Sequence, residues 1–121
     1  MRKLIAVAVL AALPAFPVLG QTVEAGTYDV RGTNLDGSKY QGTARIKLTS
    51  ETTCSIEWKT GSTSSTGICM LYENAFAASY ILGKDVGLVV YEVKGNGVLE
   101  GVWTVSGEDG SGTETLRLRR Q

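Results

Sequence analysis

Residues 40–48 read Tyr-Gln-Gly-Thr-Ala-Arg-Ile-Lys-Leu, and apolar or small residues alternate there with polar ones. One face of this stretch carries Tyr40, Gly42, Ala44, Ile46 and Leu48. The other face carries Gln41, Thr43, Arg45 and Lys47. A period of two residues is typical of a β-strand that is buried on one face and hydrated on the other. The same period recurs at residues 54–59, 99–105 and 115–119, so the sequence predicts an all-β protein.

Short turn-forming segments separate these runs. They are Asn34–Gly37, Gly61–Ser62, Gly95–Gly97 and Glu108–Ser111. Their glycines supply the positive φ that tight hairpin turns need. Counting the runs between turns predicts eight strands, near residues 26–32, 39–49, 52–59, 64–72, 75–82, 86–94, 98–106 and 112–119. Connections this short join neighbouring strands in antiparallel order.

Eight twisted strands in one short segment are expected to close, because closure removes the exposed edges of an open sheet. We therefore predict a small eight-stranded antiparallel up-and-down β-barrel, a single domain over residues 21–121. An outer-membrane barrel would need an apolar outer face. Here the residues that alternate with the predicted core include Arg45, Lys47, Glu57 and Lys59. The sequence thus predicts a barrel that does not span a membrane.

Residues 1–20 have the organisation of a secretory signal peptide. Arg2 and Lys3 precede the apolar run Leu4–Leu13, and Val18-Leu19-Gly20 offers small or apolar residues before a cleavage site. The run is about half of the roughly 20 apolar residues that a transmembrane helix needs. We therefore expect these residues to be removed on export, and the domain to be periplasmic or secreted.

The composition argues against several functional classes. The chain has 12 Lys+Arg, 12 Asp+Glu and no histidine. Balanced charge lacks the basic excess of a nucleic-acid-binding protein, and the lack of histidine removes the commonest general base and metal ligand. No glycine-rich phosphate motif leads from a strand into a helix. We expect a non-enzymatic protein that uses neither a metal nor a cofactor.

Cys54 and Cys69 are the only cysteines of the chain. They lie at equal distances from the predicted turn at Gly61–Ser62, so a hairpin places them directly opposite each other. Opposite residues of antiparallel strands have Cα atoms roughly 4.5–5.5 Å apart, which a disulfide tolerates. A redox site would show a CxxC pair or a lone thiol. The sequence predicts a structural disulfide.

Glu114 falls on the same face of its strand as Leu116 and Leu118, which the pattern places inside. A buried carboxylate needs a hydrogen-bonding or charged partner. Glu114 is therefore either the ligand-orienting group of a small pocket or a carboxylate at the barrel rim, where water reaches it. We expect the rim position.

Five aromatic residues also fall on the predicted inner face. They are Tyr28, Tyr40, Trp58, Tyr91 and Trp103. Apolar walls with a few polar groups are the usual composition of a ligand site, so these side chains are candidates for ligand binding together with Glu114. In so small a barrel, however, core filling is the expected role.

Residues 75–91 differ from the rest because they are apolar at both alternating sets of positions. Such strands are either covered on both faces or expose a patch that marks an interaction surface. We expect a contact here with another protein or with a second copy of the chain.

Turn and core residues carry a resemblance to a known group. The main stretch is Tyr28-x-Val30-x-Gly32-Thr33-Asn34-x-Asp36-Gly37-Ser38-x-Tyr40-x-Gly42, supported by Trp58, Gly67, Leu99–Thr104 and Gly112-Thr113-Glu114-x-Leu116. Together they resemble a group of small exported bacterial proteins often described as fibronectin-binding. The resemblance covers most of the segment 21–121 and implies adhesion to an extracellular protein such as fibronectin.

The predicted architecture is also similar to the calycin barrels, which include the avidins and the lipocalins. Gly26-Thr27-Tyr28 stands where lipocalins carry Gly-x-Trp, and no run matches the biotin-binding residues of the avidins. We therefore expect an exported binding protein with a protein partner. The alternatives are a carrier of a small apolar ligand in the barrel interior and a periplasmic inhibitor of a host enzyme such as lysozyme.

Overall fold

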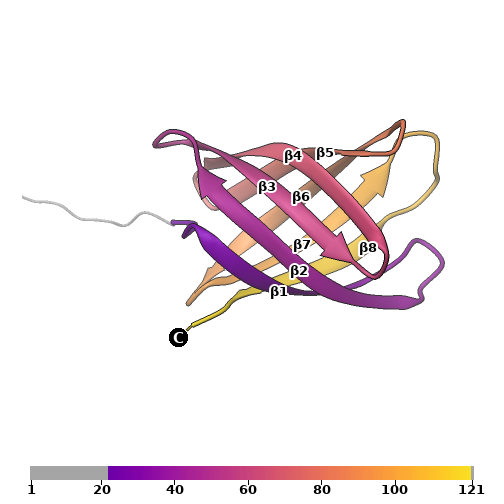
Figure 1. Cartoon of the computed structure of the whole chain (residues 1–121), viewed down its shortest axis with the longest axis horizontal. Coiled ribbons are helices and arrows are strands. Elements are labelled where there is room, and N and C mark those ends of the chain that lie inside the picture. Colours follow the sequence, from indigo (N-terminus) through magenta and orange to yellow (C-terminus); the bar gives the residue numbers. More distant parts are fainter. Residues whose placement is uncertain (1–21, 121) are drawn as a thin grey trace, which may run out of the picture.

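The computed structural model describes residues 22–120, so the predicted signal peptide lies outside the described residues. Eight strands follow one another in a single antiparallel sheet, and β8 pairs with β1 to close a barrel (Figure 1). The strands are β1 (Gly26–Thr33), β2 (Lys39–Leu48), β3 (Thr53–Thr60), β4 (Thr63–Tyr72), β5 (Ala75–Leu82), β6 (Asp85–Gly95), β7 (Val98–Val105) and β8 (Gly112–Leu118). All eight predicted strands are confirmed, to within one residue at each end.

Glycine conformation defines the hairpin turns as the sequence predicts. Gly61 has a φ of 61° and, with Ser62, forms the two-residue link between the paired residues Thr60 and Thr63. Gly37 has a φ of 88°, and its amide donates to the carbonyl of Asn34 at 2.9 Å. These turns set the register of β3 with β4 and of β1 with β2.

The barrel has two distinct ends (Figure 1). One end, which we call the closed end, carries the β2–β3, β4–β5 and β6–β7 turns together with both termini of the described chain. The opposite end, which we call the open end, carries the β1–β2, β3–β4, β5–β6 and β7–β8 turns. Within residues 22–120, no helix is long and apolar enough to cross a membrane.

Alternate residues of every strand fill the interior. On β1, for example, Tyr28 and Val30 are buried, whereas Asp29 and Arg31 are exposed. The largest fully buried side chains are Tyr28, Tyr91, Phe76, Ile46, Ile56, Leu99, Leu116 and Val30. The apolar core therefore runs from the closed end to the middle of the barrel.

The predicted disulfide is present. Cys54 on β3 and Cys69 on β4 are directly paired in register, with Cα atoms 5.0 Å apart, and both are buried. The bond lies in the half of the barrel next to the closed end and links two strands already joined by a hairpin. A disulfide is compatible with an oxidising extracellular or periplasmic compartment.

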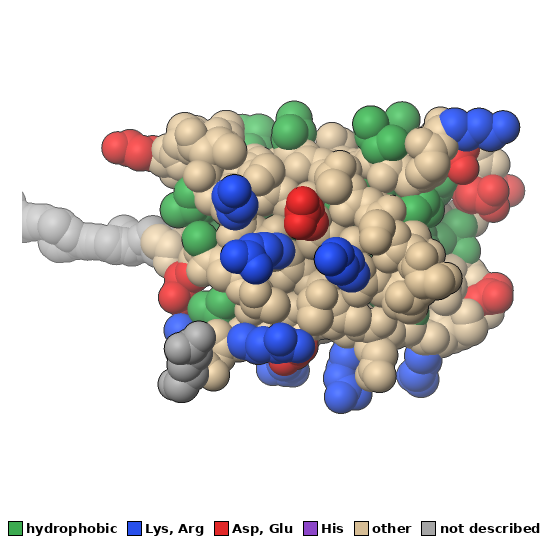
Figure 2. All heavy atoms as spheres, viewed as in Figure 1, with side chains coloured by type: hydrophobic (Ala, Val, Ile, Leu, Met, Phe, Trp, Pro, Cys, Tyr) green, Lys and Arg blue, Asp and Glu red, His purple; other side chains and the backbone are tan. Residues whose placement is uncertain are grey.

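The outer surface divides into two faces. Over β1–β3 and β8 the outward side chains are largely polar and the charged ones are mostly basic, and Figure 2 shows several basic side chains on the face of β2 and β3. Over β4–β7 many outward side chains are large, apolar and exposed. They include Ile68, Met70, Tyr72, Ile81, Val86, Leu88, Val90 and Val102. Residues 75–91 therefore have one face in the core and one apolar face in solvent.

Candidate functional site

A cavity of about 520 Å³ opens at the open end of the barrel. Small-molecule sites typically enclose roughly 300–1,000 Å³, so the cavity is of ligand size. Turn and strand-end residues form its rim, namely Asn34, Lys39, Gln41, Thr60, Gly61, Ser62 and Thr63. Deeper residues form its walls, namely Tyr40, Trp58, Ser65, Tyr80, Leu82, Val89, Trp103 and Glu114.

Glu114 borders the cavity from β8 and is only 6% exposed. The Tyr40 hydroxyl donates to Glu114 Oε1 at 2.7 Å, and Trp58 Nε1–H donates to Oε2 at 2.9 Å. The Tyr91 hydroxyl also donates to Oε2. Three strands, β2, β3 and β6, thus bring hydrogen-bond donors to one carboxyl group. Such convergence offsets the cost of burying it.

The expected rim position of Glu114 is therefore wrong. Strict alternation along β8 places Glu114 inside together with Leu116, as the sequence indicates. The tilt of the strands brings the rings of Tyr40, Trp58 and Tyr91 around the carboxyl group, so protein donors take the place of water.

Glycines make room for the rings that surround Glu114. Four aromatic residues each pair directly across the sheet with a glycine on the next strand. The pairs are Tyr40 with Gly32, Tyr80 with Gly87, Tyr91 with Gly101 and Trp103 with Gly112. In every pair, a Cβ atom added to the glycine would collide with the aromatic ring or lie inside contact distance of it. The rings therefore lie directly against glycine backbone, which fixes their positions.

The electrostatics of the site keep its phenols protonated. Burial is the main cause that raises the pKa of Glu114, and the hydrogen bonds from Tyr91, Tyr40 and Trp58 oppose it. Burial followed by the charge of Glu114 raises the pKa of Tyr80 to about 12 and that of Tyr91 well above its ordinary value. The same two causes raise the pKa of Tyr40. At neutral pH these hydroxyls remain hydrogen-bond donors.

Two further rings complete the cavity wall. The Tyr80 hydroxyl donates to the carbonyl of Thr104 at 2.9 Å, and Trp103 Nε1–H donates to the carbonyl of Thr113 at 3.2 Å. The Trp58 and Tyr80 rings meet edge to face with centroids 5.3 Å apart. Tyr40 and Trp103 form a similar pair at 6.2 Å. The cavity is therefore walled by two aromatic pairs with fixed orientations.

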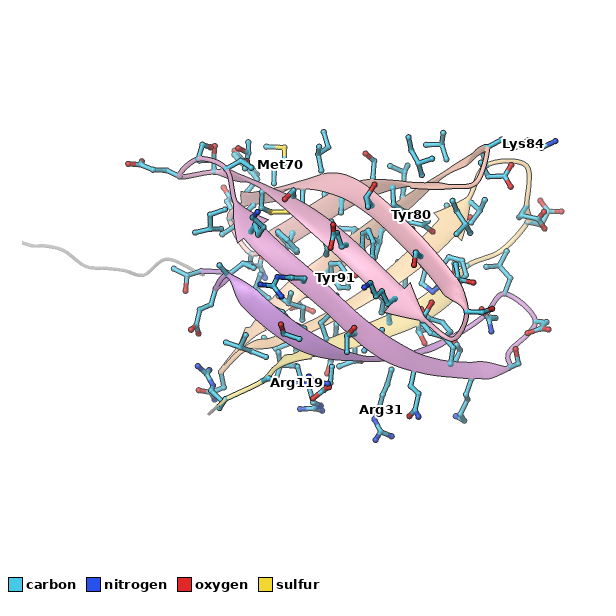
Figure 3. All side chains as sticks on the ribbon, in the orientation of Figure 1. Arg31, Met70, Tyr80, Lys84, Tyr91 and Arg119 are labelled. Atoms are coloured by element: carbon cyan, nitrogen blue, oxygen red, sulfur yellow. A yellow bond between two sulfur atoms is a disulfide. The ribbon has the colours of Figure 1, made fainter. Side chains whose placement is uncertain are left out.

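The structure brings together five of the six predicted ligand-binding residues. Tyr40, Trp58, Trp103 and Glu114 border the cavity, and the hydroxyl of Tyr91 donates to Glu114. Figure 3 shows Tyr91 inside the barrel. Tyr28 does not join them. Its hydroxyl donates to the carbonyl of Glu24 at 2.6 Å, so Tyr28 belongs to the core near the closed end.

Tyr80 is a wall residue that sequence reasoning missed. It lies in a stretch that is apolar on both faces, so the pattern gave no reason to separate it from its neighbours. The strand register could have identified Tyr80 as a wall residue, because Gly67 and Gly87 lie opposite it on the two neighbouring strands. An aromatic residue between two glycines marks a ring that lies over bare backbone.

The described residues hold no group of three or more His, Cys, Asp or Glu side chains that could bind a metal ion. The polar groups that border the cavity are the carboxyl group of Glu114, the phenols and indoles around it, Ser65 and the rim residues.

No family model and no curated protein matches the chain. Several solved structures share its fold. A redesigned β-barrel, b11L5F_LGL, superimposes with a TM-score of 0.71 at 21% identity, covering 79% of this chain and 91% of that one. EF1p2_mFAP2b bound to DFHBI gives a TM-score of 0.70 at 15% identity, covering 78% and 93%. The redesigned barrel mFAP1 bound to DFHBI gives 0.66 at 21% identity, covering 77% and 93%. At these identities the likeness is one of fold.

Proposed function

We propose that this protein is an exported, non-enzymatic carrier that binds a small organic molecule in the cavity at the open end of the barrel. The observation that carries the proposal is the construction of the cavity. Aromatic side chains from four different strands surround one buried, hydrogen-bonded carboxyl group, Glu114. Apolar walls with a small number of placed polar groups are what small-molecule sites require.

The choice of residues at the open end supports this proposal. A barrel that needed only a packed interior would place apolar residues there, as the closed end does, because close packing stabilises most. Instead the chain buries a carboxyl group, which costs free energy until donors surround it. Designed barrels of this fold bound to DFHBI add support, because a barrel of similar size accommodates a ligand.

The proposal is tested with a neutral fluorescent probe, N-phenyl-1-naphthylamine, and a matched pair of variants. Ser65 lines the cavity, whereas its neighbour Ser64 faces solvent. The Ser65→Phe variant fills the cavity and is expected to abolish saturable binding, while Ser64→Phe retains it. Equal binding by the two variants, or no saturable binding by the wild-type protein, would contradict the proposal.

A second candidate function is self-association through the outer face of β4–β7. Two adjacent rows of residues cross these strands. The rows are Ile68, Ser79, Leu88 and Thr104, and Met70, Ala77, Val90 and Val102. None of these side chains is charged, and the exposed fractions of the large apolar ones lie between 46% and 72%. An exposed apolar patch of this kind typically marks a protein contact.

The shape of this face favours a second copy of the chain as the partner. The small residues of β5 form a trough between the larger side chains of β4 and β6. Two such faces can therefore interdigitate, and the basic outer face of β1–β3 stays in water. A host protein such as fibronectin, which the sequence resemblance implies, is the competing occupant.

Sedimentation velocity tests self-association. The Leu88→Asp variant is expected to convert a dimer to a monomer, whereas Thr43→Asp on β2, across the barrel from β6, leaves it unchanged. A monomeric wild-type protein that binds immobilised fibronectin through Leu88 would favour the competing occupant instead.

A further inference from the structure

We infer that the cavity selects a cation, in the form of a protonated amine carried on an apolar or aromatic body. This inference rests on the proposed small-molecule function and assigns the chemical class of the ligand. Three features carry it: the use of hydrogen-bond donors, the placement of charge, and the aromatic composition of the wall.

The polar hydrogens of the five aromatic side chains around the site are already used within the protein. Tyr40, Trp58 and Tyr91 donate theirs to Glu114. Tyr80 and Trp103 donate theirs to backbone carbonyls. A phenol has one hydrogen and an indole has one N–H, so these groups have no donor left for a ligand. The groups around Glu114 therefore present phenol and carboxyl oxygens that accept hydrogen bonds, and a ligand that binds beside this carboxyl group has to bring the donors.

Glu114 has room to accept a further hydrogen bond. Its Oε2 receives two donors, from Trp58 and Tyr91, whereas Oε1 receives one, from Tyr40. Each carboxylate oxygen has two lone pairs. Oε1 therefore retains a lone pair for an N–H group that enters the cavity.

The distribution of charge around the cavity also favours a cation. Among the described residues that border it, Glu114 is the acidic side chain and Lys39 the basic one. Lys39 is exposed at the rim, where water screens its charge, but Glu114 is buried. A charge in a poorly hydrated site acts much more strongly than one in water. An entering cation is attracted by Glu114, and an entering anion is repelled.

The aromatic composition of the wall adds to this preference. The edge-to-face pairs Trp58–Tyr80 and Tyr40–Trp103 line the cavity from four strands. The face of an aromatic ring carries negative charge density and attracts cations, most strongly for tryptophan. A protonated amine between these rings also has apolar contacts for the rest of the molecule.

The test uses three ligands that share one ring and differ in charge: benzylamine, benzyl alcohol and benzoate. Each displaces N-phenyl-1-naphthylamine from the wild-type protein at pH 7. Benzylamine is expected to bind about tenfold or more tightly than benzyl alcohol, and benzoate is expected to bind weakest. Glu114→Gln should bring the benzylamine to benzyl alcohol ratio close to one. The matched control is Glu100→Gln on the outer face of β7, which should keep the wild-type order.

The outcomes separate this inference from the proposed function. If benzyl alcohol or benzoate binds as tightly as benzylamine, or if the probe binds and none of the three displaces it, the inference of a cation is overturned while the small-molecule function stands. If neither the probe nor any of the three compounds binds saturably, the proposed function itself is overturned. The wild-type series decides between these outcomes even if Glu114→Gln does not fold.

Discussion

The two ends of the barrel are built from the same eight strands but carry different residues at their inward positions. Toward the closed end, aliphatic and aromatic side chains pack against one another and against the Cys54–Cys69 disulfide. At the open end, rings lie on glycines and surround the carboxyl group of Glu114. The closed end therefore has a packed core, whereas the open end has a cavity. The comparison shows how a single alternating pattern can serve both purposes.

Strand β5 allows the strongest test of this difference, because it has a core residue near the closed end and a cavity residue at the open end. Phe76 near the closed end is 1% exposed, whereas Leu82 at the open end is half-buried beside the cavity. We expect Phe76→Ala to lower the free energy of unfolding by about 3–5 kcal/mol, because it leaves a void in a packed core. Leu82→Ala should lower it by less than about 1 kcal/mol. Urea denaturation measures both, and equal losses would contradict the division into two ends.

Reduction of the disulfide is expected to have the next largest effect. Cys54 and Cys69 are 15 residues apart in sequence, and the chain-entropy model gives about 3 kcal/mol for a loop of that length. Urea denaturation with and without dithiothreitol measures the loss. Binding of the probe by the reduced protein, under conditions where it remains folded, should be unchanged because the bond lies away from the cavity. A loss of probe binding without unfolding would show that the two ends are coupled.

A smaller effect is expected from adding one methyl group at the open end. In Gly112→Ala, the new Cβ would collide with the carbonyl oxygen of Thr33 and with the ring of Trp103, so both the backbone of β1 and the ring have to move. We expect a loss of about 1–3 kcal/mol from overpacking, together with weaker probe binding and a changed near-UV circular dichroism spectrum. Ser111→Ala, at the exposed neighbouring position, is the control. If Gly112→Ala leaves both the spectrum and the affinity unchanged, the ring does not rest on this glycine.

Local patterns predicted the fold almost completely, and the reason is physical. Alternation and turn glycines are properties of neighbouring residues, so the bounds of β5 and the turn at Gly61–Ser62 follow from short stretches of sequence. The pairing of Cys54 with Cys69 followed because both belong to one hairpin. These features do not depend on how distant strands meet inside the barrel.

The site depended on distant contacts and was predicted only in part. The sequence placed Glu114 on the inner face, but it could not show that Tyr40, 74 residues away, lies beside it. Depth along the barrel is set by the tilt of all eight strands, so the rim and the interior look alike in a local pattern. Tyr28 shares the alternation of the cavity residues, yet it lies near the closed end for the same reason.

The smallest predicted effect is a pH dependence of stability that Glu114 introduces. Its pKa in the folded protein is raised above the ordinary value of 4.5, chiefly by burial. Between that value and the raised pKa the folded state holds the proton more tightly than the unfolded state, so stability is full below this window and falls as pH rises through it. The wild-type protein should therefore lose stability relative to Glu114→Gln as pH rises from 4.5 through the raised pKa of Glu114.

Thermal unfolding of the two proteins across this pH range measures the effect. The Glu100→Gln variant is the control, and its difference from the wild type should stay constant because the side chain is exposed. If the wild type instead gained stability over Glu114→Gln as pH rises, burial would not be the dominant influence on the carboxyl group.

The central claim is that the open end binds a ligand, and the two tryptophans of the chain test it most directly. Trp58 and Trp103 are its only tryptophans, and both line the cavity. In a ¹H–¹⁵N spectrum recorded during titration with benzylamine, both indole N–H resonances should shift and saturate with one affinity, while the amides of the closed end stay in place. Shifts confined to the outer face of β4–β7, with both indole resonances unchanged, would contradict the account.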